Sequence, residues 1–200
     1  MVSSIKIEFF FLFIFLPTIL FFIPDTKLIF TTLYVVFFFS LWKIKKDKTF
    51  NFSNLKNKPD CKFIFLYFLI FSLLGFFYTF FVDKSLFFIF PKENPKVWLL
   101  VIILYPFFSV IPQEFIYRVF FFQRYKKILS KNLFIKYFIN SLIFSYAHII
   151  FQNYHAVIIT ALVSPIFYYS YKKKSFLTCI LVHSIGGLLI FTYGLGKFFI

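Results

Sequence analysis

Residues 63–82 read FIFLYFLIFSLLGFFYTFFV, a run of twenty residues without a single charged side chain. A helix of about 20 apolar residues is long enough to span the hydrocarbon core of a bilayer. Lipid offers no hydrogen bonds to the backbone, so a spanning segment must satisfy its own polar groups, as a helix does. This stretch therefore predicts a membrane-spanning helix.

Similar apolar runs, separated by short polar breaks, recur along the whole chain. Hydrophobic residues make up 61% of the 200 and charged residues 14%, and Phe alone accounts for 39. A soluble fold of this size has too little interior to bury so much aromatic surface. We expect an all-α, polytopic bundle of about seven transmembrane helices, forming one transmembrane domain over residues 1–200. The expected spans lie near residues 5–23, 28–42, 63–82, 97–122, 137–152, 156–171 and 176–193.

The net charge of +15 is distributed unevenly along the chain. If the N-terminus is cytoplasmic, most of the 22 Lys and Arg residues fall in segments on the cytoplasmic side. This asymmetry follows the positive-inside rule. The basic residues therefore indicate topology in a membrane, which we expect to be a bacterial plasma membrane, with lipid and no nucleic acid as a partner.

Two charged residues lie inside a predicted span rather than at its ends. A charge at the centre of a membrane helix costs roughly 2.5–3.5 kcal/mol on insertion scales. Glu114 and Arg118 are four residues apart, so they share a helix face and can pair. Pro112, just before them, predicts a kink in the fourth span. The pair is either a structural ion pair that fixes packing or part of a functional site.

Two histidines also fall inside predicted spans, His148 in the fifth and His183 in the seventh. Counted from the expected cytoplasmic ends at 1.5 Å per residue, Glu114, His148 and His183 lie roughly 12, 17 and 11 Å deep. The value for His148 depends on a fifth span that begins after Lys136. Three separate helices would then bring polar side chains to one layer.

A carboxylate and imidazoles around a wet pocket indicate hydrolytic chemistry. A carboxylate and an imidazole can together take a proton from water. Alternatively, Glu114, His148 and His183 can ligate zinc and leave one position open for water. Either route makes a nucleophile for a carbonyl carbon, so we expect hydrolysis of a peptide bond in or near the membrane. A transporter would require polar or broken segments in both halves, which the first three spans lack.

Three short motifs follow one another on separate spans: Gln113-Glu114-x-x-x-Arg118, Phe144-x-x-x-His148 and His183. They resemble the E-E-x-x-x-R, F-x-x-x-H and H-x-x-x-N/D motifs of the CAAX-protease and bacteriocin-processing (CPBP, or Abi) intramembrane metalloproteases. The likeness covers roughly residues 95–195, the expected catalytic core. It implies a metalloendopeptidase with a cytosol-facing cavity that acts on membrane-associated or lipidated peptides or proteins.

The resemblance also implies roles for individual positions. In the family the first Glu and first His activate water, and the second His and the Asn stabilise the oxyanion; by position these are Gln113, His148, His183 and Gly187. An amide is no base and Gly has no side chain, so two of the four have changed type. Glu114 could take over as the base, oriented by Arg118. The alternative is a catalytically impaired member that binds a membrane peptide, for instance in bacteriocin self-immunity.

Overall fold

The computed structural model describes residues 2–199, and within this range all regular structure is helical, with no strand. The predicted all-α class is therefore confirmed. Five helices are long and apolar enough to cross a membrane: Ser4–Phe22, Thr26–Lys46, Cys61–Val82, Pro95–Arg124 and Leu133–Phe151. Two shorter helices, Tyr154–Tyr169 and Phe176–Thr192, lie at the sixth and seventh expected spans.

Short polar side chains begin four of these helices. Asp25, Asp60, Asn132 and Ser175 each accept a hydrogen bond from a backbone N–H in the first turn that follows. Such a cap satisfies a donor that the helix itself leaves unpaired. The polar breaks between the apolar runs thus contain the signals that start the helices.

The cap at Asn132 corrects the predicted start of the fifth span. Helix α9 runs over Leu133–Ala147 rather than from residue 137. His148 therefore lies about 22 Å from the start of its helix, not 17 Å. The common depth estimated for the three polar side chains rested on the later start, so that estimate is wrong.

The chain divides into two compact units, Met1–Asn51 with Pro112–Tyr168, and Phe52–Ile111 with Tyr169–Ile200. The long helix Pro95–Arg124 contributes to both units, because the division falls at Pro112. That the whole chain forms one transmembrane domain stays a prediction.

The first unit is built on its N-terminal helices. It contains α1 (Val2–Phe10), α2 (Leu16–Phe22), α3 (Thr26–Lys46), α7 (Ile111–Glu114), α8 (Phe121–Arg124), α9 (Leu133–Ala147) and α10 (Tyr154–Tyr169). Of these, α7 belongs to the unit from Pro112 on and α10 up to Tyr168. Helix α3 packs on the segment Phe115–Phe120, where the rings of Phe37 and Phe115 meet edge to face at 5.5 Å. Aromatic packing of this kind holds the charged segment against α3.

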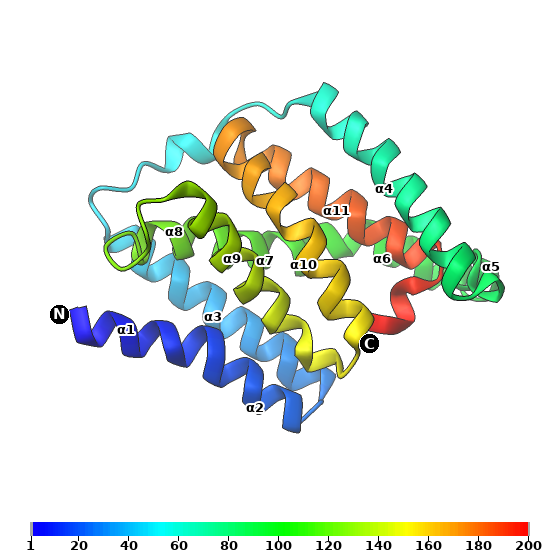
Figure 1. Cartoon of the computed structure of the whole chain (residues 1–200), viewed down its shortest axis with the longest axis horizontal. Coiled ribbons are helices and arrows are strands. Elements are labelled where there is room, and N and C mark those ends of the chain that lie inside the picture. The colour runs from blue at the N-terminus through cyan, green and yellow to red at the C-terminus, as the bar shows by residue number, and fades with distance from the viewer. Residues whose placement is uncertain (1, 200) are drawn as a thin grey trace. The chain divides into compact units, whose positions relative to one another are not determined.

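The second unit is built around α11. It contains α4 (Cys61–Val82), α5 (Ile89–Glu93), α6 (Pro95–Tyr105) and α11 (Phe176–Thr192). Helix α11 packs along α4 and also contacts α6 (Figure 1). This arrangement places His183, on α11, within reach of residues of α6.

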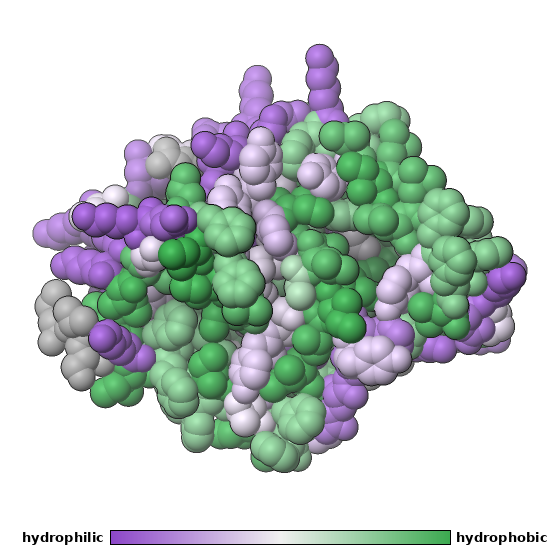
Figure 2. Space-filling model, in the orientation of Figure 1, coloured by the Kyte–Doolittle hydropathy of each residue, from purple (hydrophilic) through white to green (hydrophobic). Residues whose placement is uncertain are grey.

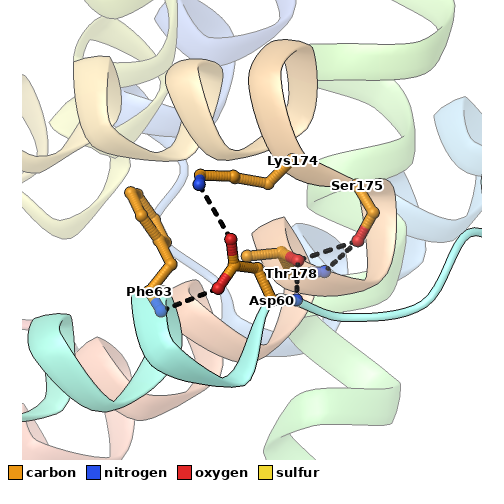
Figure 3. A network of polar contacts seen from close by, with 5 residues as sticks. All are labelled: Asp60, Phe63, Lys174, Ser175 and Thr178. Atoms are coloured by element: carbon orange, nitrogen blue, oxygen red, sulfur yellow. Dashed lines mark hydrogen bonds and ion pairs between the residues drawn. The ribbon is translucent and has the colours of Figure 1, made fainter.

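A polar network joins the start of α4 to the start of α11 (Figure 3). The carboxylate of Asp60 accepts from the backbone N–H of Phe63 at 3.0 Å and pairs with Lys174 Nζ at 2.8 Å. The backbone N–H of Asp60 donates to Thr178 Oγ1 at 2.9 Å, and Ser175 caps α11 through the N–H of Thr178. One aspartate thus caps its own helix and binds the neighbouring one.

Large apolar side chains remain on the surface. Phe22, Phe81 and Phe134 are 74%, 80% and 76% exposed, and apolar side chains cover much of the face drawn in Figure 2. Contiguous apolar surface on this scale is unfavourable in water and is typical of a lipid-facing protein. The surface therefore agrees with a polytopic helical membrane bundle.

Candidate active site

Glu114 and Arg118 form an ion pair inside the first unit. Arg118 Nε lies 3.0 Å from Glu114 Oε2, and both side chains are completely buried. The pair spans one helical turn, as the spacing of four predicts. A charge-assisted hydrogen bond between buried groups is strong, so it holds both side chains in one orientation.

The remaining nitrogens of Arg118 reach side chains of two other helices. Nη1 donates to Asn140 Oδ1 on α9, and Nη2 lies 3.3 Å from Ser164 Oγ on α10. Asn140 in turn donates from Nδ2 to the carbonyl oxygen of Tyr117 at 2.9 Å. The planar guanidinium offers its donors in a fixed fork. Arg118 therefore ties three helical segments together around the carboxylate of Glu114.

The backbone around this pair departs from a regular α-helix. Pro112 lies in the short α-helical stretch Ile111–Glu114, between two segments with wide π-type turns, Pro106–Val110 and Phe115–Phe120. Proline lacks the N–H that would bond one turn back, and π turns inside α-helices are frequent at functional sites. Wide turns thus flank Pro112 on both sides, and the kink predicted there stays a prediction.

His148 directly follows α9 at its C-terminal end, and one of its ring nitrogens contacts a backbone carbonyl oxygen. Its Nδ1 is 2.8 Å from the carbonyl oxygen of Phe144. A carbonyl can only accept, so Nδ1 carries the proton in the neutral ring and Nε2 is left as an acceptor. This tautomer is the one that a base acting through Nε2 requires.

Helix α9 contacts the segment that carries Arg118. Asn140 and Phe144 both contact Arg118, the latter with its ring centroid 5.0 Å from Cζ. One turn further along α9 is His148, and one turn back along the other helix is Glu114. Glu114 and His148 therefore each lie one turn from a residue of the Arg118 contacts, in the same unit.

His183 lies in the second unit, on the buried face of α11. The ring is 6% exposed, and its Nε2 lies 3.4 Å from the Tyr105 hydroxyl of α6. Gly187, four residues later on the same face, is also buried. The ring of Tyr105 covers this face.

The other predicted site residues differ in what surrounds them. Gln113 is half-buried and directly precedes Glu114 in α7. Over residues 2–199, no three His, Cys, Asp or Glu side chains gather closely enough to hold a metal ion. Ligation of zinc by Glu114, His148 and His183 finds no preformed site in this geometry and stays a prediction from the sequence.

Three residues of the candidate site escaped the sequence analysis: Asn140, Ser164 and Tyr105. A signal was present for Asn140, because an amide in the middle of an apolar span needs a partner at depth. Serine and tyrosine are common in this chain, so neither Ser164 nor Tyr105 stands out. Their roles follow only from contacts between distant segments.

A comparison with known protein families gives a match over the part of the chain that holds these residues. Residues 95–189 match the family described as type II CAAX prenyl endopeptidase Rce1-like. No curated protein and no solved structure matches the chain. The match begins at Pro95, where α6 starts, and ends on α11 after Gly187. The apolar helices and this match indicate an integral membrane protein whose residues 95–189 are similar to the Rce1-like CAAX protease family.

Proposed function

We propose that the chain is an intramembrane endopeptidase that hydrolyses peptide bonds of membrane-associated or lipidated substrates. The observation that carries the proposal is the contact of His148 Nδ1 with the Phe144 carbonyl oxygen at 2.8 Å, which favours the neutral ring with its proton on Nδ1. An imidazole in this state can act as a general base toward water. The family match supports the same class of reaction.

The reaction assigns one role to each polar side chain. His148 Nε2 takes a proton from water, and the oxygen of that water bonds to the carbonyl carbon of the substrate. A hydrogen-bond donor stabilises the oxyanion that forms, the role that the family likeness implies for His183. His148 then returns its proton to the leaving amine as the C–N bond breaks. Glu114, fixed by its ion pair with Arg118, has a structural role in this scheme.

The same proposal includes an orientation and partners. Lys43, Lys45 and Lys46 end α3, and basic residues at a helix end are favourable both for the helix dipole and for the cytoplasmic leaflet. We place the N-terminus in the cytoplasm, in a bacterial plasma membrane. The partners are membrane lipid and a membrane-associated peptide or protein, with no nucleic acid.

The test compares membranes of cells that express the wild type, His148→Ala or His155→Ala, by mass spectrometry of newly formed peptide termini. His155 is the matched control, because it is a histidine of the same unit. It lies in the first turn of α10, outside the Glu114–Arg118 cluster. We expect termini that are present with the wild type and His155→Ala and absent with His148→Ala. Identical profiles for all three, at equal amounts of inserted protein, would refute proteolysis.

A second candidate function is supported by Gln113 and Gly187, which stand where the resembled family has side chains that act in catalysis. A member with these changes could bind a membrane peptide without cleaving it. Gln113→Glu separates the two functions. If the scaffold is an impaired protease, the added carboxylate raises turnover by roughly 10²–10⁴, the usual contribution of a general base. If it is a binder, Gln113→Glu produces no new termini.

A further inference from the structure

Tyr105 fills the space of the side chain that position 187 lacks. A Cβ placed on Gly187 would overlap the hydroxyl and the ring edge of Tyr105. Glycine at this position therefore permits a close approach that any other residue would block. The two residues belong to α11 and α6 of the same unit.

The position of the Tyr105 ring is defined along three turns of α11. His183, Gly187 and Phe191 are spaced by four and share one helix face. The hydroxyl lies 3.4 Å from His183 Nε2, and the ring meets Phe191 edge to face at 5.5 Å. The aromatic contact orients the ring, and the gap at Gly187 admits the hydroxyl beside His183.

We propose that Tyr105 is a positioning residue for His183, to which it supplies a hydrogen bond from α6 through the space that Gly187 leaves open. An imidazole on a helix rotates about two side-chain bonds, and one hydrogen bond at Nε2 restricts that rotation. The phenol hydroxyl can donate or accept, so it serves either tautomer of the ring. The consequence for turnover rests on the proposed proteolysis, whereas the contact with His183 does not.

The first test observes the His183 ring directly. The full chain is labelled with ¹⁵N-histidine and placed in lipid nanodiscs, and the signals of the three histidines are assigned by single substitutions. We expect Tyr105→Phe to shift the Nε2 resonance of His183 and to leave those of His148 and His155 unchanged. Tyr67→Phe, which removes a hydroxyl from α4 of the same unit, is the matched control and should shift none. An unchanged His183 resonance in Tyr105→Phe would overturn the proposal.

The second test measures turnover on a peptide that the wild type cleaves. We expect Tyr105→Phe to lower kcat by about tenfold or more with little change in KM, as for a group that acts mainly in the transition state. The double variant Tyr105→Ala/Gly187→Asn removes the ring and adds an amide in its place, and it should recover part of the kcat that Tyr105→Ala loses. An unchanged kcat in Tyr105→Phe would refute the positioning role.

The two tests also separate this proposal from the proposed function. If the wild type cleaves nothing, proteolysis is refuted, and the NMR measurement alone decides whether Tyr105 holds His183. If the wild type cleaves and the His183 resonance does not respond to Tyr105→Phe, the proposal about Tyr105 fails while the proposed function stands.

Discussion

Replacement of Arg118 by Met tests whether the buried ion pair organises the first unit. Arg118 is fully buried and donates to Glu114, Asn140 and Ser164. Methionine keeps much of the length and apolar volume of the Arg118 side chain but removes all of its hydrogen-bond donors. The carboxylate of Glu114 then loses its counter-charge in a site with no exposed surface.

The expected loss of stability follows from the three contacts. A hydrogen bond to a charged group contributes about 1.5–3 kcal/mol and a neutral one about 0.5–1.5 kcal/mol. Breaking a buried ion pair from one side costs about 3–5 kcal/mol, because the other charge is left uncompensated. We therefore expect Arg118→Met to lower the free energy of unfolding by about 3–5 kcal/mol. Arg118→Lys keeps the charge but not the fork, and it should lose less.

The double variant Glu114→Gln/Arg118→Met tests the reasoning most sharply. It leaves no uncompensated charge, so it should be more stable than Arg118→Met alone. Unfolding in mixed micelles with increasing SDS, followed by far-ultraviolet circular dichroism, gives the free energies. The control is Glu8→Gln, which weakens the more exposed pair with Arg124 and should cost less than Arg118→Met. Equal stabilities of the single and double Arg118 variants would refute a role for the unpaired carboxylate.

Two further predictions concern the second unit. The hydrogen bond between Asp60 and Lys174 lowers the pKa of Asp60 below its ordinary 3.8, and the same hydrogen bond raises the pKa of Lys174 above its ordinary 10.5. The stabilisation by this pair is therefore complete between about pH 4 and 10. It declines at lower pH as Asp60 is protonated and at higher pH as Lys174 is deprotonated. When unfolding midpoints are measured against pH, Asp60→Asn should remove the loss of stability at low pH. Gly194 has a φ of 82°, and a Cβ there would overlap the carbonyl oxygen of Leu86. Gly194→Ala should therefore lower the unfolding midpoint, and Gly194→Ala with a midpoint equal to the wild type would contradict this assignment.

The sequence was sufficient for the charged core of the candidate site because that core is local. Glu114 and Arg118 are one turn apart, and their pairing needs only a helix. The start of α9 could also have been predicted, since Asn132 is a residue type that caps helices and three apolar residues follow it directly. The positive charge of Lys136 suggested that the span begins after this residue, whereas the cap at Asn132 starts the helix at Leu133.

The partners of the core depended on the tertiary structure. Asn140 and Ser164 lie 22 and 46 residues from Arg118, and Tyr105 lies 78 residues from His183. No local pattern links such positions, because the contact depends on how two helix faces pack. The space at Gly187 likewise has meaning only once α6 lies beside α11.

The sequence by itself determined that the chain is helical and membrane-embedded, because lipid requires long apolar segments that satisfy their own backbone. It also determined which ionisable side chains remain within the spans and which family their spacing resembles. Only the tertiary structure decided how two of those side chains are held: Arg118 by two other helices and His183 by a tyrosine. The reason is that burial makes each polar group depend on a specific partner, and the packing of the helices selects that partner.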